Sequence, residues 1–387
     1  MQWSAPSLYH DPDYQDVLTT YRIDEAEHVA RLLDVAALDD GIARDIEKRA
    51  ADLVSVVRDK ASEGGGIDAF MAEYELSSAE GVVLMCLAEA LLRIPDSETV
   101  DKLIEDKIGG SNWESHLGES KSWFVNASTW GLMVTGRMLR RDDLPQRNFK
   151  STLQRLVRRS GEPFIRQAVR RAMRLMGHQF VMGRTIHEAI KNARALEKRG
   201  YSYSYDMLGE AARTDADAQR YFDDYHNAIV ACGEESRDRG PEDAPGVSVK
   251  LSALHARYEL GHRERVIAEL FPRLQQLTRL AAKYDINLTV DAEEADRLDL
   301  SLELFEMASG DAMLGDWQGL GLALQAYQKR ALDVIDWLAA VGRRHNRRIM
   351  LRLVKGAYWD TEIKRAPVEG IDGFPVFTRK AATDVSY

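Results

Sequence analysis

From about residue 20 to residue 62 the chain has the hydrophobic pattern of long helices. In the stretch "DEAEHVARLLDVAALDDGIARDIEKRAADLVSVVRDKA", residues 24–61, apolar residues recur at spacings of three and four, and no proline interrupts them. This pattern predicts a helical arm over residues 1–62. Such an arm could mediate dimerisation, or its helices could pack on a core of their own, and the pattern fits both interpretations.

The helical pattern resumes after a run of three glycines at residues 64–66. Ser77 and Glu80 have the spacing of a capping box, which predicts a helix that starts there and runs through Leu92. Because no strand-like alternation follows, we expect an all-helical domain over residues 63–180.

From residue 200 onward the pattern changes to short apolar or alternating segments separated by helical ones. The strand-like segments are "YSYDMLGEA" from Tyr203, "VSVKLSALH" from Val247, "NLTVDAEEAD" from Asn287, "GLGLALQAY" from Gly319 and "RIMLRLVKGAY" from Arg348. Strands that alternate with helices at this interval indicate parallel β/α units. None is followed by a complete GxGxxG motif, which weakens a dinucleotide-binding sheet. We therefore predict the α/β class, with an incomplete (β/α)8 barrel of about five strand units over residues 181–387.

Each predicted strand ends on a polar residue. These residues are Asp206, Lys250, Asp291, Gln325 and Arg352. The catalytic groups of a β/α barrel converge from the carboxyl ends of its strands. Five polar strand ends in succession therefore predict an active site at that edge.

Lys250 lies in "SVKLS", where alternation places it on the same side as Ser248 and Ser252. An inward-facing lysine could hold a substrate carboxylate as a cation. Desolvated, it could instead have a lowered pKa and attack a carbonyl as an amine. A third interpretation is an ion pair with Asp291 or another acid.

Asp291 opens the acidic run "DAEEAD", whose members have different expected roles. Glu293, Glu294 and Asp296 lie where a helix would begin, and acids there interact favourably with the helix dipole. We expect those three to be structural and Asp291, still on the strand, to be functional.

The stretch "RLVKGAYWD", residues 352–360, supplies cations and aromatic rings at the end of the fifth strand. Arg352 and Lys355 suit an anionic ligand or an electron-rich ring. Gly356 and the alanine after it permit close backbone approach, and Tyr358 and Trp359 offer flat surfaces with one polar group each. A flavin uses all of these features.

Composition and motifs narrow the classes of partner and site that we expect. The chain has 52 Lys and Arg against 62 Asp and Glu, a formal charge of −10, which argues against a nucleic-acid partner. Cys86 and Cys232 lie far apart, and no HxH, HExxH or GxSxG motif is present, so we expect neither a metal nor a covalent serine site. The polar N-terminus and the lack of a long apolar run favour a cytoplasmic protein.

Arginines accumulate between residues 137 and 174, with Arg166, Arg170 and Arg174 at four-residue spacing. A basic helix face of this kind could contact an anionic membrane surface peripherally. It could equally be a solvated face paired with nearby acids.

Long blocks of the chain resemble the flavin-dependent proline dehydrogenase domain of the proline utilization A family. The blocks are "ELSSAEGVVLMCLAEALLRIPD", "RSGEPFIRQAVRRAMRLMGHQFV", "GYSYSYDMLGEAA", "VKLSALH", "DAEEADRLDLSLELF", "LQAYQKR" and "RLVKGAYWDTEIKRA". The resemblance implies that L-proline is oxidised to pyrroline-5-carboxylate by hydride transfer to an FAD, and that a membrane quinone then accepts the electrons. It also implies a homodimer.

The resemblance also implies roles for single residues. Lys250 would contact the proline carboxylate, and Asp291 and Tyr358 would line the substrate pocket beside the flavin. Gln325 and Arg352 would face the isoalloxazine ring, with Arg352 near N5. The remaining FAD contacts would be Val354, Lys355, Gly356, Ala357 and Trp359, with Thr378, Arg379 and Lys380 at the phosphate and adenosine end.

Members of this family continue through three more barrel strands and an arginine-bearing helix, and bifunctional members carry a downstream aldehyde dehydrogenase domain. A full barrel takes about 250 residues, more than follow residue 200, so we expect a fragment that lacks turnover alone. Two other functions stay open. A Schiff-base lyase or aldolase would use Lys250, and a non-catalytic helical assembly module would need no site at all.

Overall fold

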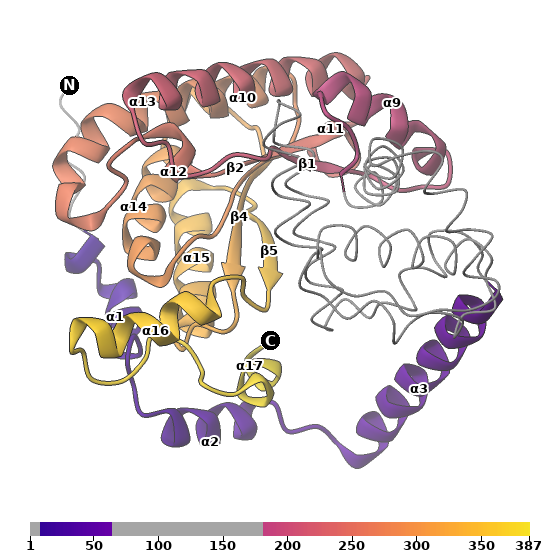
Figure 1. Cartoon of the computed structure of the whole chain (residues 1–387), viewed down its shortest axis with the longest axis vertical. Helices are drawn as coiled ribbons and strands as arrows, with labels where there is room; N and C mark the ends of the chain where they lie inside the picture. Colours follow the sequence, from indigo (N-terminus) through magenta and orange to yellow (C-terminus); the bar gives the residue numbers. More distant parts are fainter. Residues whose placement is uncertain (1–7, 64–180) are drawn as a thin grey trace, which may run out of the picture. The chain divides into compact units, whose positions relative to one another are not determined.

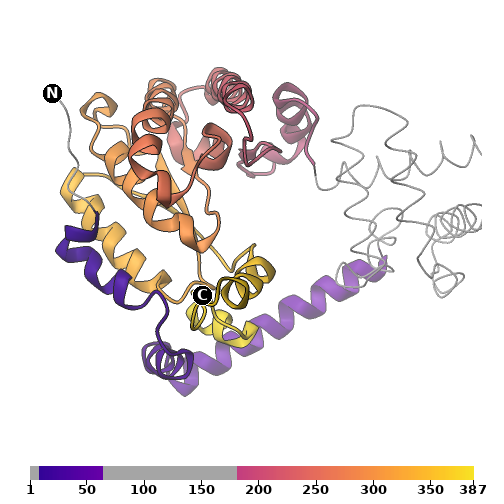
Figure 2. The same cartoon turned by 60° about the vertical axis from the view of Figure 1, so that its left-hand side comes forward.

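The computed structural model describes residues 8–63 and 181–387 (Figures 1 and 2). The predictions for the glycine run, the capping box and the arginine-rich stretch lie outside these residues. The chain divides into two compact units, one of Met1–Ala37 with Ala193–Tyr387 and one of Leu38–Asn192. Residues 8–37 therefore share a unit with the five strands. The three segments expected from the sequence stay a prediction.

Five parallel strands form one sheet in chain order, as the alternating segments predict. They are β1 (Ser204–Asp206), β2 (Gly246–Val249), β3 (Leu288–Val290), β4 (Leu320–Gln325) and β5 (Met350–Val354). Each strand pairs with its neighbour in sequence, for example Val247 with Leu288 and Leu322 with Leu351. Strands in chain order joined by helices are the arrangement of a (β/α)8 barrel, here with five strand units. The predicted fold class is confirmed.

Helices separate the strands and cover one face of the sheet (Figure 1). The connecting helices are α10 (Asp215–Ser236) and α11 (Gly240–Asp243) after β1, α12 (Leu251–Leu254) and α13 (Arg263–Lys283) after β2, α14 (Leu298–Ser309) after β3, α15 (Ala331–His345) after β4, and α16 (Trp359–Glu369) and α17 (Lys380–Ser386) after β5. Helix α10 begins with a capping box in which the Thr214 hydroxyl accepts from Asp217 N at 3.1 Å and the Asp217 carboxylate accepts from Thr214 N at 3.1 Å.

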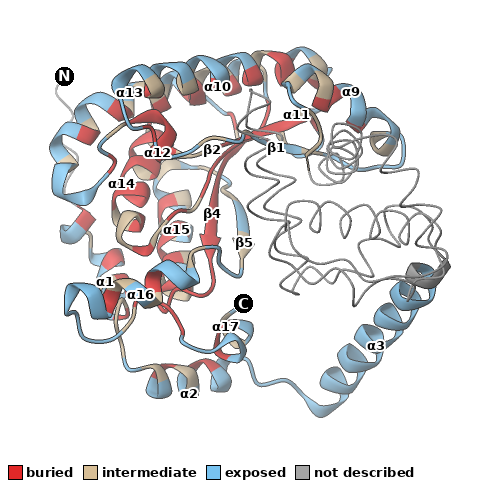
Figure 3. Cartoon of the chain, in the orientation of Figure 1, coloured by how far each residue is buried: buried red, intermediate tan, exposed pale blue. Residues whose placement is uncertain are grey.

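The three middle strands are buried along their whole length, whereas β5 is partly exposed (Figure 3). Alternate residues such as Val249, Val290 and Leu322 are buried apolar side chains. The opposite face carries smaller polar groups, where the Thr289 hydroxyl donates to Asn287 Oδ1 at 2.9 Å. Period-two alternation therefore separates an apolar face from a polar one, and the polar face leads to the carboxyl ends of the strands.

The N-terminal segment consists of η1 (Leu8–His10), η2 (Pro12–Tyr14), α1 (Gln15–Thr19) and α2 (Glu25–Val35), and it packs on the unit that holds the sheet. The ring of Tyr14 lies edge-on to Trp337 of α15, with centroids 5.4 Å apart. The Trp337 indole N–H donates to Asp11 at 3.0 Å, and the Thr20 hydroxyl donates to Asp333 at 2.5 Å. These contacts explain why residues 8–36 belong to this unit.

The remaining long helices of the described ranges are α3 (Asp40–Glu63) and α9 (Ile186–Glu197). The break between α2 and α3 falls at residues 36–39, inside the stretch predicted to be helical from its apolar spacing. Within residues 8–63 and 181–387, no helix is both long and apolar enough to span a bilayer.

Candidate active site

The polar strand ends lie at one edge of the sheet. Asp206 ends β1, Lys250 and Asp291 directly follow β2 and β3, Gln325 ends β4, and Arg352 lies in β5. Because all five strands run parallel, their carboxyl ends share an edge. The structure thus brings together the candidate residues on which the sequence-based hypothesis depends.

Lys250 lies between two carboxylates. Its ammonium donates to Asp206 Oδ1 at 2.7 Å and to Asp291 Oδ2 at 3.0 Å. The side chain of Asp291 is 6% exposed and that of Lys250 is 13% exposed, whereas that of Asp206 is 52% exposed. The pair with Asp291 is therefore the buried part of this arrangement, and Asp206 is the partner that solvent reaches.

Arg352 completes the group from the other side of Asp291. Its guanidinium forms an ion pair with the second carboxylate oxygen of Asp291 and donates to Ser248 Oγ at 3.0 Å. Ser248 was not a candidate, although alternation placed it on the same side of β2 as Lys250. We call Asp206, Ser248, Lys250, Asp291 and Arg352 the carboxyl-edge cluster.

The pKa of Lys250 decides between two interpretations of this residue. Burial alone would lower it, but the charges of Asp291 and Asp206 and their hydrogen bonds outweigh burial and raise it above its usual value. Lys250 is therefore a cation at neutral pH. A lysine that forms a Schiff base needs a lowered pKa, so this environment disfavours the lyase or aldolase interpretation.

Gln325 connects two loops and stands apart from the ion pairs. Its side-chain N–H donates to the Glu293 carbonyl at 2.7 Å, and its Oε1 accepts from Ala357 N at 2.9 Å. The side chain is buried. It therefore ties the loop after β3 to the Gly-Ala turn after β5 and sets where that turn lies.

Tyr358 lies at the N-terminus of α16, directly after this turn. Burial raises the pKa of its hydroxyl, and the negative charges of Glu210, Glu293 and Glu294 raise it further. The hydroxyl is consequently neutral and available as a hydrogen-bond donor at any physiological pH.

The acids that follow Asp291 hold the local fold. Glu293 accepts from Ser252 N at 2.9 Å and pairs with Arg297 at 2.8 Å, and Glu294 pairs with the same arginine at 3.1 Å. Asp296 pairs with Arg365 of α16 at 2.6 Å. Glu293 and Asp296 join the segment after β3 to α12 and α16, and Glu294 pairs with Arg297 within its own turn. These contacts fit the structural role expected for the three acids.

Most of the other predicted cofactor residues lie beyond the end of β5. The ammonium groups of Lys355 and Lys380 both pair with Asp384 of α17, and the Trp359 indole N–H donates to the Phe377 carbonyl at 2.9 Å. The backbone N–H and hydroxyl of Thr378 donate to Glu25.

The last two predicted cofactor residues contribute through their backbone. Arg379 is the N-cap residue of α17, and Val354, the last residue of β5, accepts from Ala326 N at 2.7 Å. Of the residues beyond β5, Lys355 and Lys380 share one partner, Asp384, and so form a second charged group that has no residue in common with the carboxyl-edge cluster.

Gly356 is the position in this turn where glycine is required. Its φ is +147°, and a Cβ atom there would lie 2.4 Å from the ring of buried Tyr327. We expect Gly356→Ala to lower the free energy of unfolding by about 3 kcal/mol, because backbone strain adds to overlap with the ring. Urea denaturation measures this loss.

The matched control for Gly356 is Gly370→Ala. Gly370 also has a positive φ, +64°, but no atom lies within 4 Å of the position of its Cβ. It should lose only about 1 kcal/mol, from strain alone. Equal losses in the two variants would contradict a specific role for the contact with Tyr327.

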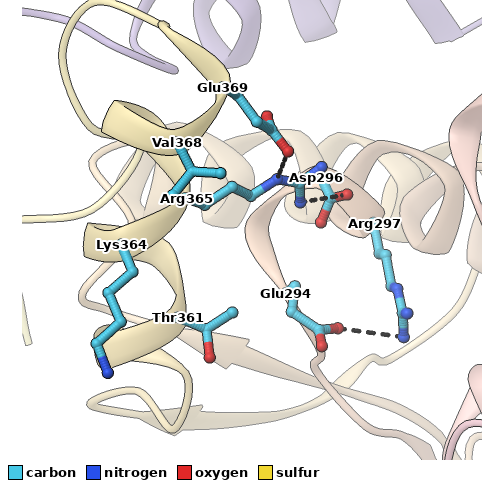
Figure 4. A pocket seen from close by; sticks show the side chains of 8 residues that line it. All are labelled: Glu294, Asp296, Arg297, Thr361, Lys364, Arg365, Val368 and Glu369. Atoms are coloured by element: carbon cyan, nitrogen blue, oxygen red, sulfur yellow. Dashed lines mark hydrogen bonds and ion pairs between the residues drawn. The ribbon is translucent and has the colours of Figure 1, made fainter.

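A cavity of about 450 Å³ lies next to this region but outside the carboxyl-edge cluster (Figure 4). It is lined by Glu294, Asp296, Arg297, Thr361, Lys364, Arg365, Val368 and Glu369. Arg365 pairs with Asp296 at 2.6 Å and with Glu369 at 2.7 Å. Because its carboxylates are paired with its own arginines, we assign this cavity no part in the chemistry.

Comparison with known families identifies three segments of the chain. A model described as "Proline dehydrogenase" matches residues 189–387, which contain all five strands. A model described as "Proline utilization A proline dehydrogenase N-terminal domain" matches residues 15–58. A third, described as "DNA-binding domain of Proline dehydrogenase", matches residues 66–180, all of them outside the described residues. The absence of a nucleic-acid partner therefore stays a prediction.

Individual proteins resemble nearly the whole chain. "Bifunctional protein PutA" of Salmonella typhimurium is 52% identical over 96% of this chain, and that of Rhizobium meliloti is 51% identical over 96%. A crystal structure of a Bradyrhizobium japonicum Proline Utilization A mutant matches 95% of this chain at 47% identity with a TM-score of 0.66. The chain spans only 28% and 30% of the two curated relatives and 36% of the crystallised chain.

Proposed function

This chain belongs to the proline dehydrogenase family, and from that premise we propose that it forms part of an enzyme that oxidises L-proline to pyrroline-5-carboxylate with FAD. The observation that carries the proposal is the carboxyl-edge cluster, in which Lys250, Asp291 and Arg352 converge from three strands. A β/α barrel gathers its catalytic groups at this edge. The cations of the cluster, Lys250 and Arg352, lie at this edge, where they could bind an anionic substrate and stabilise a reduced flavin.

Lys250 is the proposed ligand of the proline carboxylate. Its two present partners differ in exposure, since Asp291 is buried and Asp206 is not. A substrate carboxylate can take the place of the exposed Asp206 carboxylate at the Lys250 ammonium. The buried Asp291 keeps its hydrogen bond to Lys250 and so holds the lysine in place. Charge-assisted hydrogen bonds of this kind are stronger than neutral ones, so Lys250 would both bind and orient the substrate.

Arg352 and Tyr358 would also act on the substrate and the cofactor. Asp291 and Ser248 hold the Arg352 guanidinium in one orientation, which presents a fixed positive charge at the rim. The neutral hydroxyl of Tyr358 would line the substrate pocket. When bound, FAD would accept the hydride from the ring carbon beside the proline nitrogen. That nitrogen loses its proton as the C=N bond of pyrroline-5-carboxylate forms.

The residues beyond β5 suit the phosphates of FAD. Lys355 and Lys380 have side chains that are 49% and 79% exposed, and both direct their ammonium groups at one carboxylate, that of Asp384. Two accessible cations that converge on a single anionic group form an arrangement that a diphosphate can use. These lysines, with Thr378 and Arg379, would hold the phosphate and adenosine end, and Gln325, Val354, Gly356, Ala357 and Trp359 would lie along the rest.

A homodimer, a cytoplasmic location and peripheral membrane contact are proposed from the helical arm, the polar N-terminus and the arginine-rich stretch of the sequence. The family resemblance alone supports the membrane quinone as electron acceptor and an aldehyde dehydrogenase domain downstream in a longer parent protein. The relatives named "Bifunctional protein PutA" are more than three times as long as this chain, which supports the last of these.

The test is flavin binding followed by reduction with L-proline. The 387-residue chain is purified and incubated with FAD, and if its reading frame continues past codon 387 the longer product is treated in the same way. In the longer product we expect bound FAD whose absorbance is bleached anaerobically by L-proline and not by D-proline, with pyrroline-5-carboxylate identified by mass spectrometry. The 387-residue chain alone should show no turnover. FAD that stays oxidised in the longer product, or borohydride trapping of a carbonyl substrate on Lys250, would contradict the proposal.

A further inference from the structure

Helix α2 of the N-terminal segment lies against the last helix, α17, more than 340 residues later in the chain (Figures 1 and 2). Phe377, which is fully buried, stacks on His28 with ring centroids 5.8 Å apart and planes 9° from parallel. Leu32 and Ala382 complete a small buried cluster with Phe377. An apolar contact thus fixes the segment that leads into α17.

Glu25, the first residue of α2, adds a polar contact at the same place. Its carboxylate accepts from Thr378 N at 2.9 and 3.1 Å and from the Thr378 hydroxyl at 3.1 Å. Thr378 precedes the N-cap residue of α17, so its N–H has no partner within that helix. Glu25 supplies the partner that the helix cannot.

Further hydrogen bonds hold both sides of this contact. Arg22 donates to the Gly373 carbonyl at 2.8 Å, so the α16–α17 connection is held at Gly373 as well as at Thr378. The Lys329 ammonium donates to the Ile23 carbonyl at 2.8 Å. The Lys329 carbonyl accepts from the His28 ring at 2.8 Å. Burial lowers the pKa of His28, so the ring that bonds to the Lys329 carbonyl is favoured in its neutral form.

We propose that α2 is a clamp that positions residues 377–380 and that Glu25 is its positioning residue. The carbonyl of Phe377 accepts from the Trp359 indole, so the clamp reaches the residue next to Tyr358. The expected effect of the clamp on FAD affinity rests on the proposed function, in which Thr378, Arg379 and Lys380 contact the phosphate and adenosine end of FAD. The clamp itself rests on the contacts alone.

The matched pair Glu25→Ala and Glu27→Ala tests the clamp in the full chain. Both acids lie in the first turn of α2, so both changes remove a charge that favours the helix dipole. Only Glu25 contacts Thr378. In hydrogen–deuterium exchange, we expect the amides of residues 377–383 to exchange roughly tenfold faster in Glu25→Ala than in wild type. They should be unchanged in Glu27→Ala.

The variant Glu25→Gln distinguishes a loss of local positioning at residues 377–383 from a loss of stability of the whole chain. Glutamine keeps the length and one acceptor oxygen, so its exchange rates should fall between those of wild type and Glu25→Ala, with the urea midpoint of the whole chain close to that of wild type. Equal exchange at residues 377–383 in wild type and Glu25→Ala would overturn the clamp.

FAD titration followed by flavin fluorescence tests the consequence for the cofactor. We expect the Kd of Glu25→Ala to rise roughly tenfold above those of wild type and Glu27→Ala, since a lost positioning hydrogen bond to a charged group weakens binding by about that factor. Faster exchange with an unchanged Kd would overturn the link to FAD. Faster exchange in a longer product that binds no FAD would support the clamp and contradict the proposed function.

Discussion

Replacing Lys250 by methionine should lower kcat/KM for L-proline by roughly 100-fold or more, because losing one partner of a buried, hydrogen-bonded charge pair costs about 2–5 kcal/mol. Methionine keeps the length of the side chain but cannot donate to a carboxylate. It also leaves Asp291, which is buried, with Arg352 as its remaining cation. Steady-state kinetics of the product that reduces FAD with L-proline measure the effect.

The split between kcat and KM tells what Lys250 does. If it holds the carboxylate equally well before and during hydride transfer, KM rises and kcat changes little; if it mainly orients the ring, kcat falls as well. The control is Lys198→Met, since Lys198 is exposed and is not a member of the carboxyl-edge cluster. A folded Lys250→Met protein with wild-type kinetics would remove this lysine from the site.

The strand ends could be predicted from the sequence because their pattern is local. In "SVKLS", alternation alone places Ser248 and Lys250 on one side, and the structure shows both of them in contact with residues of the same cluster. Parallel strands bring their carboxyl ends together whatever the loop sequences are. The meeting of Lys250, Asp291 and Arg352 therefore follows from topology and a two-residue period.

The partners that complete each contact could not be predicted in this way. Glu25 reads as an ordinary first-turn acid of α2, and only the folded chain places it on Thr378, 353 residues away. The pairing of Asp384 with Lys355, 29 residues earlier, also depends on the fold, whereas its pairing with Lys380 at i,i+4 is a local helical one. Contacts across such separations depend on how whole helices pack, and one sequence carries no pairwise signal for them.

Arg330 is the clearest residue of this kind. In "LQAYQKR" it looks like a solvent-exposed cation at a helix start, but its side chain is 0% exposed. The guanidinium donates to Asp299 Oδ1 and to the Ala295 carbonyl, each at 2.6 Å, and lies 4.2 Å from the centre of the Tyr21 ring. Asp299 also accepts from the Tyr14 hydroxyl. One buried cation therefore joins the start of α14 to the N-terminal segment.

Arg330→Leu should lower the free energy of unfolding by about 3–5 kcal/mol, because it leaves the Asp299 carboxylate, only 12% exposed, without its cation and the Ala295 carbonyl without a donor. The leucine fills part of the space but satisfies neither oxygen.

The loss of stability is measured by urea denaturation. The control is Arg343→Leu, which removes an exposed arginine of the same helix, α15, and should change stability by no more than about 0.5 kcal/mol. A loss below about 1 kcal/mol for Arg330→Leu would mean that this pair contributes no more than an ion pair on the surface. In that case the N-terminal segment would be held by its apolar contacts and by the hydrogen bonds of α2 instead.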